Sequence, residues 1–208
     1  MITVGSLNEF MVTRAHPDYE AYLVFLFSSG LQALLPKKYA IKPYKIGESG
    51  WATVFSLDRT YVVLSQRSPQ YTRKMLEYLI GDELEATGLR IFRVAKTEKS
   101  QQYKIALKGT GAPLDLYKRI QYLKDTIPQY VYGKIYFIKY ARNPVEYVKN
   151  ALLPAPRDKI LKVIHRKDVN QMDVYVDMAW VGIFMGKNGN NVASACKLTG
   201  FTVKIILD

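Results

Sequence analysis

One order of expected elements occurs twice in the last two thirds of the chain, and this repeat strongly limits the possible folds. The first copy is expected to contain a helix over 69–80 capped by Ser68-Pro69, strands 89–96 and 103–108, a helix 114–125 and a strand 131–139. The second copy starts at Asn143-Pro144 with a helix, followed by strands 160–165 and 172–177, two helices around a glycine loop, and a strand 201–207. We interpret the two segments as copies of one supersecondary unit.

The segment before the repeat has a different pattern. Short apolar runs alternate with turn residues, and strands are expected over 10–14, 22–27, 31–34, 51–56 and 61–64. Five short strands in so short a segment are typical of a small closed β-barrel. The sequence therefore predicts a multidomain α+β protein in which a small barrel precedes two α/β units.

The loop Gly186-Lys187-Asn188-Gly189, called the GKNG loop below, lies between two expected helices of the second copy. Its glycines allow a tight turn and a close approach of the backbone to a ligand. A helix starting at Asn190 points its positive end at the loop, and Lys187 adds charge, so a phosphate is favoured there. Asn188 and Asn190 can donate hydrogen bonds, and Met185, Ile183 and Val192 would line an apolar groove for bases. The simpler alternative is that the glycines only end one helix and start the next.

The charge balance points to the same class of ligand. The chain has 30 Lys and Arg residues against 18 Asp and Glu residues, which gives a net charge of +12. An excess of this size favours a polyanionic partner, because each neutralised phosphate releases counterions. Basicity that serves only solubility is the alternative.

Aromatic and basic residues of the barrel segment are further candidates. Phe10, Tyr22, Phe25 and Phe27 could stack on bases, and Lys37, Lys38, Lys42 and Lys45 could contact the backbone of a nucleic acid. Alternating residues of a strand face opposite sides, so at most one of the sets Tyr22/Val24/Leu26 and Leu23/Phe25/Phe27 lies outside the barrel. For any single aromatic residue, packing in the core is the alternative.

Other classes of function find no support in the sequence. The carboxylates Asp82, Glu83 and Glu85 have no His or Cys partner nearby, no Cys/His spacing suits a metal ion, and no phosphate-binding Gly-x-x-x-x-Gly-Lys loop occurs. We predict no enzymatic activity, no metal and no cofactor. The single Cys196 fits a reducing compartment, and the apolar run 21–35 is broken by Ser28-Ser29-Gly30, so a cytoplasmic protein without a membrane span is expected.

Several segments resemble the bacterial transcription factor family NusA. Residues 143–152, Asn-Pro-Val-Glu-Tyr-Val-Lys-Asn-Ala-Leu, are similar to the family's interdomain helix. The GKNG loop with Asn191-Val192 and the stretch Lys197-Leu198-Thr199-Gly200-Phe201 resemble the loop and the following helix end of its second KH domain. Residues 30–37 and 63–71 resemble its OB barrel of the ribosomal S-one type and the join to its first KH domain.

The resemblance implies three domains, an OB-fold barrel over 1–67, a degenerate KH domain over 68–141 and a type II KH domain over 142–208. Together with the barrel candidates chosen above from residue chemistry, the residues expected to bind single-stranded RNA are Met185, Gly186, Lys187, Asn188, Gly189, Asn190, Asn191, Val192, Lys197, Phe10, Phe25, Lys37 and Lys38.

The sequence departs from the family pattern at three places. The run from Lys108 to Pro113 leads almost directly into the next helix, so the first copy has no room for a Gly-x-x-Gly loop. Ala193 stands where the family usually has a basic residue. The family's N-terminal polymerase-binding domain has no counterpart here, which suggests either a truncated chain or a reduced relative.

By this resemblance the protein is expected to hold nascent RNA and to modulate elongation, pausing, termination or antitermination. Its expected partners are single-stranded RNA and RNA polymerase or other transcription factors, and a monomer is implied. Two alternatives stay open: an RNA-binding protein of ribosome assembly or translation, and a protein-interaction scaffold that has lost its affinity for RNA.

Overall fold

The computed structural model describes residues 2–58, 61–97 and 102–207. The chain divides into two compact units, Met1–Gly81 with Asp125–Tyr132, and Asp82–Lys124 with Gly133–Asp208. We call them unit 1 and unit 2 and describe each by itself. The three-domain partition expected from the sequence stays a prediction.

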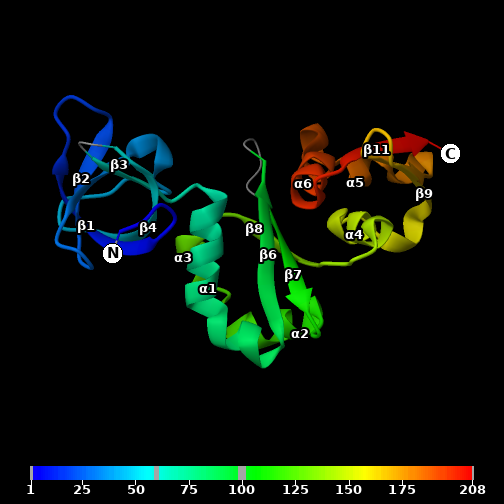
Figure 1. Cartoon of the computed structure of the whole chain (residues 1–208), viewed down its shortest axis with the longest axis horizontal. Coiled ribbons are helices and arrows are strands. Elements are labelled where there is room, and N and C mark those ends of the chain that lie inside the picture. The colour runs from blue at the N-terminus through cyan, green and yellow to red at the C-terminus, as the bar shows by residue number, and fades with distance from the viewer. Residues whose placement is uncertain (1, 59–60, 98–101, 208) are drawn as a thin grey trace. The chain divides into compact units, whose positions relative to one another are not determined.

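Unit 1 contains a closed five-stranded barrel, as predicted (Figure 1). The strands follow the order β1-β2-β3-β5-β4, and β1 pairs with β4 to close the barrel. The pair β3 and β5 is parallel and the other pairs are antiparallel. This arrangement is consistent with an OB-fold. The strands are β1 (Leu7–Ala15), β2 (Ala21–Leu26), β3 (Gln32–Pro36), β4 (Ser49–Leu57) and β5 (Val62–Ser65), with a 3-10 turn η1 (Lys37–Tyr39) after β3.

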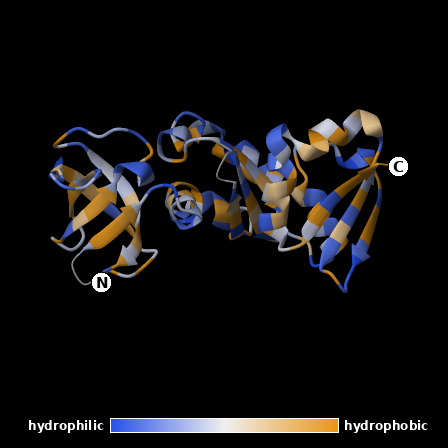
Figure 2. Ribbon diagram, turned by 90° about the horizontal axis from the view of Figure 1, so that it is seen from above, coloured by the Kyte–Doolittle hydropathy of each residue, from blue (hydrophilic) through white to orange (hydrophobic). Residues whose placement is uncertain are grey.

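Alternation along the strands decides which barrel side chains are buried. Figure 2 shows hydrophobic and hydrophilic residues alternating along strands of the structure. Tyr22, Val24 and Leu26 of β2 lie in the barrel core, whereas Phe25 is half-buried and Phe27 is exposed, as the alternation predicts. Phe10 was expected to stack on bases, and this is wrong. Its side chain is 0% exposed in the same core, where its ring contacts Tyr44 edge-on, so neither face is free for a base.

The chain leaves the barrel through α1 (Pro69–Ala86). The predicted start is confirmed, since the Ser68 hydroxyl accepts a hydrogen bond from the Tyr71 backbone N–H at 3.0 Å. The backbone departs from helical angles at Ile80, close to the point where unit 1 gives way to unit 2. Unit 1 also includes the short α3 (Ile127–Tyr130), whose Tyr130 carbonyl accepts a hydrogen bond from the Tyr71 hydroxyl at 3.1 Å.

Unit 2 holds two three-stranded sheets of identical topology. In each sheet the second strand lies in the middle, antiparallel to the first and parallel to the third. The predicted repeat is therefore present in the sheets. The strands are β6 (Leu89–Lys96), β7 (Gln102–Gly109) and β8 (Lys134–Lys139) in the first copy, and β9 (Ile160–Arg166), β10 (Gln171–Val176) and β11 (Thr202–Leu207) in the second.

The helices of the second copy follow the prediction, and those of the first depart from it. The expected helix 114–125 is broken into α2 (Pro113–Arg119) and the 3-10 turn η2 (Ile120–Leu123), with α3 following. Pro128 lies in the first turn of α3, where its missing N–H is tolerated, but it could not continue a longer helix. The second copy contains α4 (Pro144–Ala151), η3 (Arg157–Lys159), η4 (Met178–Trp180), α5 (Val181–Met185), η5 (Lys187–Gly189) and α6 (Asn190–Thr199). Among the helices described, none is both long and apolar enough to cross a membrane.

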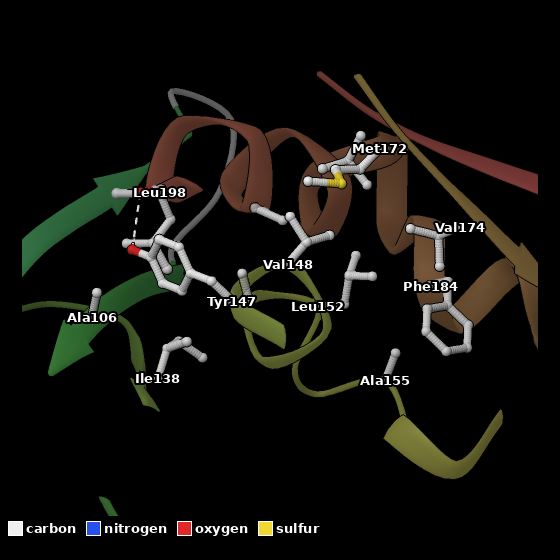
Figure 3. Packing of buried hydrophobic residues seen from close by; sticks show 14 of the residues in the cluster. Ala106, Ile138, Tyr147, Val148, Leu152, Ala155, Met172, Val174, Phe184 and Leu198 are labelled. Carbon is white, nitrogen blue, oxygen red and sulfur yellow. Dashed lines mark hydrogen bonds between the residues drawn. The ribbon is translucent and has the colours of Figure 1, made fainter. Parts of the chain in front are cut away.

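A single hydrophobic core joins the two copies within unit 2. Ala106 and Ile138 of the first sheet, Tyr147, Val148 and Leu152 at α4, Phe184 of α5, Leu198 of α6, and Met172 and Val174 of the second sheet all belong to it (Figure 3). The Tyr147 hydroxyl donates to the Leu198 carbonyl at 3.1 Å, the contact drawn in Figure 3. Helices α4 and α6 therefore share one core with both sheets.

The burial of Phe10 can be tested by truncation. We expect Phe10→Ala to lower the free energy of unfolding of the barrel by roughly 3–5 kcal/mol, because a large aromatic side chain is removed from a closed core. Urea unfolding in a Trp180→Phe background, in which Trp51 of β4 is the remaining tryptophan, would measure this. The control Phe27→Ala removes an exposed ring and should change stability by less than about 1 kcal/mol. A stable Phe10→Ala protein that had lost only RNA affinity would contradict the core assignment.

Candidate nucleic-acid interface

The GKNG loop is built on left-handed backbone conformations. Gly186 has φ 68° and ψ 170°, Asn188 has φ 55° and ψ 29°, and Gly189 has φ 72° and ψ 10°. A Cβ on Gly186 would lie 2.8 Å from the Asn191 Cβ, so this position needs glycine for space as well as for backbone angle. A Cβ on Gly189 would meet nothing within 4 Å, and there the backbone angle alone favours glycine.

The loop presents its polar side chains to solvent at the start of α6. Lys187 and Asn188 are exposed, and Gly189 is the N-cap of the helix. Among the described residues no side chain caps this end, so the positive end of the helix is open to an anion, although the Asn190 backbone N–H already donates to the Lys187 carbonyl. Met185 and Ile183 of α5 are exposed by 38% and 47%, and Val192 is half-buried. The structure thus brings together the charged, amide and apolar residues expected at this loop.

Asn191 was expected to contact RNA, but its side chain is only 3% exposed and has a structural role. Its amide nitrogen donates to the carbonyls of Leu152 and Phe184, both at 2.9 Å. These bonds tie the start of α6 to the end of α4 and to α5, the helix before the loop. Asn191 therefore fixes the loop from behind instead of reaching a ligand.

A lysine of the first copy completes this support. Lys104 of β7 is 0% exposed, and its ammonium donates to the Asn191 side-chain oxygen at 2.6 Å and to the Asn191 carbonyl at 3.0 Å. It also donates to the carbonyl of Ala151, the last residue of α4. The carbonyl end of a helix carries partial negative charge and favours a cation. All three N–H groups of the ammonium thus have oxygen partners.

Burial and hydrogen bonding act on Lys104 in opposite directions. Burial lowers the pKa of Lys104 from 10.5 to about 7, because the ammonium loses its hydration. The three oxygen acceptors favour the charged form, since a neutral amine has only two N–H groups to offer.

Helix α6 lies along strand β6 of the first copy. At its start, the Asn190 side-chain oxygen accepts a hydrogen bond from the Thr97 hydroxyl at 3.3 Å. At its end, Arg93 donates to the Leu198 carbonyl at 3.1 Å. Lys197 was expected to bind RNA with the loop, but it is seven residues beyond Asn190, about 10 Å along the axis. Its exposed ammonium instead lies 3.3 Å from the Lys96 carbonyl.

The barrel offers a second surface that differs from the one expected. Lys37 and Lys38 are exposed on η1, as a binding role needs, and Phe25 is half-buried against Phe27. A pocket of about 430 Å³ lies on the outer face of β2, β3 and β5. Its lining includes Tyr19, Tyr61 and Lys38, and the His16 ring lies 4.6 Å from that of Tyr19 and 6.3 Å from that of Tyr61. Aromatic rings beside a lysine suit an unpaired base and its phosphate.

Sequence reasoning missed Lys104 and the tyrosines of this pocket. Lys104 lies between the buried residues Tyr103 and Ile105 of β7. A buried cation there needs hydrogen-bond partners from elsewhere in the fold, and these cannot be seen in the local sequence. Tyr19 lies in the turn between β1 and β2, and nothing local distinguishes it from a solvated turn residue. Among the described residues, no group of three or more His, Cys, Asp or Glu side chains could hold a metal ion.

Comparison with known proteins finds relatives of one name at low sequence identity. No protein-family model matches the sequence. The transcription termination/antitermination protein NusA of Halalkalibacterium halodurans is 25% identical over 190 residues, covering 84% of this chain and 47% of that protein. The Bacillus subtilis protein of that name is 23% identical over 193 residues, covering 88% of this chain and 51% of its own length. That of Rickettsia prowazekii is 28% identical over 75 residues, covering 36% of this chain and 15% of that protein.

The chain spans about half the length of the first two relatives. These matches support a relationship to the NusA family. The crystal structure of APE1850 aligns with a TM-score of 0.44 at 20% identity, over 62% of this chain and 94% of that one, a likeness too small to argue from.

Lys104 should make stability depend on pH in a defined direction. With a pKa of about 7 in the folded protein and 10.5 when unfolded, it holds more protons in the unfolded state between these values. The free energy of unfolding should therefore rise with pH above 7, by at most about 1.4 kcal/mol per pH unit from this group. Urea unfolding at pH 6 to 9.5 would show the difference between wild type and Lys104→Met growing with pH.

The exposed Lys118 of α2 supplies the control. Lys118→Met removes the same charge from a solvated position, and its difference from wild type should be flat over this range. If the Lys104→Met difference is also flat, Lys104 keeps its proton in the folded protein and the oxygen acceptors outweigh burial.

Proposed function

We propose that the protein binds single-stranded RNA as a non-enzymatic factor of the NusA kind, and that the GKNG loop is the clamp of a type II KH domain. The observation that carries this proposal is the loop geometry, in which positive φ angles at Gly186, Asn188 and Gly189 lead into a start of α6 that no side chain caps. The element order α4, β9, β10, α5, α6, β11 supports the same assignment. The first copy is then a degenerate KH domain, because the segment 110–133 between β7 and β8 has glycine only at positions 111 and 133, next to its two ends, and so contains no Gly-x-x-Gly.

In this proposal the loop grips the RNA backbone and the adjacent groove receives the bases. The N–H groups at the start of α6 and the Lys187 ammonium neutralise a phosphate. Ile183, Met185 and Val192 give an apolar floor on which unpaired bases lie, and Asn188 can donate to base edges or phosphates. Asn191 and Lys104 act as positioning residues behind the loop.

The barrel provides a second contact to the same RNA. Its pocket draws residues from β2 and β3 and from the segments between β1 and β2 and between β4 and β5. Oligonucleotides characteristically bind OB-folds at this part of the barrel. Tyr19 and Tyr61 would stack on bases, and Lys38, with Lys37 beside it, would contact phosphates.

The role in transcription comes from the relatives. Proteins named for transcription termination and antitermination match most of this chain. We propose that this protein holds nascent RNA during elongation, with RNA polymerase as a partner. The domain partition that fits this proposal is an OB-fold over 1–67, a degenerate KH domain over 68–141 and a KH domain over 142–208.

The clamp can be tested by reversing its charge. Lys187→Asp with Asn188→Asp places carboxylates where phosphates would bind, so we expect a loss of affinity for short single-stranded RNA without unfolding. Wild-type contacts to about four phosphates predict a log–log slope of affinity against salt of roughly −3, which the variant should lose. Fluorescence anisotropy with labelled oligonucleotides across a salt series measures both quantities.

A matched variant controls for net charge. Lys118→Asp with Gln121→Asp changes the charge by the same amount at exposed positions of α2 and η2, and should keep most of the affinity. Equal losses in both variants would mean that only overall charge matters, and unchanged binding by the clamp variant would overturn the KH assignment.

The transcriptional role has its own test. Added to a purified bacterial RNA polymerase on a template with a hairpin terminator, the protein should change pausing or termination efficiency, and the clamp variant should not. An unaltered transcript pattern with RNA binding intact would overturn the transcriptional part of the proposal alone.

A further inference from the structure

We propose that the outer face of the second sheet, opposite to the face covered by α4, α5 and α6, is a further binding surface for single-stranded RNA, separate from the GKNG loop. This inference rests on the proposed RNA-binding function and adds a site to it. The surface, called the β10 face below, consists of Lys162 and Arg166 of β9, Asp173 and Tyr175 of β10, and Lys204 of β11.

Strand alternation places these residues away from the core of unit 2. The residues of β10 that belong to this core are Met172, Val174 and Val176. Asp173 and Tyr175 lie between them in the strand and therefore point to the other side of the sheet. In the register, Lys162 is paired with Tyr175, and Lys204 is paired with Asp173. Both lysines are exposed, so the β10 face has cations on each side of its middle strand.

The equivalent face of the first sheet packs against protein and is built differently. Counted from the start of the pairing with the third strand, Ala106 of β7 occupies the position that Tyr175 has in β10. Ala106 is 0% exposed in the core shared with α4 and α6. Helices packed on the β10 face would instead meet a tyrosine ring and would take the ammonium groups of Lys162 and Lys204 out of water. The β10 face is therefore suited to a solvated anionic ligand and not to a further pair of helices.

The charges of this face that are free to bind a ligand are all positive. Asp173 is the only carboxylate among its described residues, is 2% exposed, and accepts hydrogen bonds from Arg166 and from the Gln171 side chain. Arg166 uses its Nε–H for this contact, and its side chain is 54% exposed. The terminal N–H groups are left for a phosphate, which a guanidinium fixed in this way can bind with two parallel hydrogen bonds.

Tyr175 offers a ring for stacking in the middle of this charge. It lies on the central strand of the sheet and is half-buried, and the Lys162 ammonium is 5.9 Å from the centre of its ring. Asp173, which holds Arg166, is two residues away in β10, about 7 Å along the strand. A base stacked on Tyr175 would therefore have a neighbouring phosphate within reach of Arg166 or Lys204. Aromatic rings on a sheet surface hold unpaired bases in this way in other RNA-binding folds.

Single-stranded RNA is the ligand that uses all of these groups. Each nucleotide supplies a flat base for the ring and a phosphate for the cations around it. Ile206, paired with Tyr175 from β11, is half-buried and extends the apolar surface beside the ring. Because stacking tolerates every base, the β10 face should bind RNA without sequence preference. An acidic peptide would neutralise the same cations and is the competing ligand in the experiment.

A tryptophan in place of Tyr175 can report binding at this face in the full chain. In a Trp51→Phe and Trp180→Phe background, Tyr175→Trp provides the single tryptophan, whose fluorescence a stacked base should quench. We expect quenching by an oligouridine of about 12 nucleotides. The quenching should persist when Lys187→Asp and Asn188→Asp are added, because the clamp lies on the other side of the sheet.

The cations are tested by a matched pair of variants in the same background. Lys162→Gln with Lys204→Gln removes two charges and leaves the ion pair of the face intact. It should raise the RNA concentration at half-quenching roughly 10-fold and reduce the log–log salt slope by about 1.4, as expected for two phosphate contacts to a single strand. The control Lys118→Gln with Lys124→Gln removes the same charge from exposed positions and should leave both quantities nearly unchanged.

The outcomes separate this surface from the proposed function. Absence of quenching, or its loss with the clamp substitutions, while anisotropy shows that the wild type binds RNA, would overturn the β10 face and leave the clamp assignment standing. Equal effects of the two lysine pairs would also overturn it, since only overall charge would then matter. A fluorescence change with an oligoglutamate of similar length but not with RNA would overturn it in favour of an acidic protein segment. If anisotropy shows no binding of RNA to the wild type, the proposed function itself fails.

Discussion

Much of unit 2 depends on one buried ammonium. Lys104 enters the space between the two copies from β7, and its three hydrogen bonds go to the end of α4 and the start of α6. The Asn191 side chain, held by Lys104, donates in turn to the carbonyl of Phe184 in α5 and to that of Leu152, the residue after α4. Because the Gly186 backbone is packed against Asn191, the conformation of the GKNG loop follows from a residue about 80 positions earlier in the chain.

This arrangement gives the first copy a reason to persist without a glycine loop of its own. Its sheet supplies part of the shared core, its Lys104 positions Asn191, and its strand β6 supports α6 through Thr97 and Arg93. In the proposed function these contacts hold the clamp in a binding-competent geometry before RNA arrives. Preorganisation of this kind reduces the entropy that binding would otherwise cost.

The sequence alone predicted most of the elements, because local signals determine them. The alternation in β2 correctly separated Val24 from Phe25, and Asn143-Pro144 marked the start of α4. The failures all involve long-range packing. Nothing near Phe10 shows that its strand face closes against Tyr44, and Asn191 looks like any polar residue at a helix start until Lys104 is placed beside it. The break after α2 was missed because residues 114–125 contain no Gly or Pro that would mark the end of a helix at Arg119.

The shared core of unit 2 also bears on how such a protein can evolve. A repeat usually allows one copy to be lost, moved or exchanged, because each copy is a self-contained piece. Here the second copy cannot be separated from the first without exposing Ala106 and Ile138 and leaving the oxygens of Asn191 and Ala151 without their donor. The two halves are therefore inherited as one piece, and a change on either side of α6 will be kept only if the other side accommodates it.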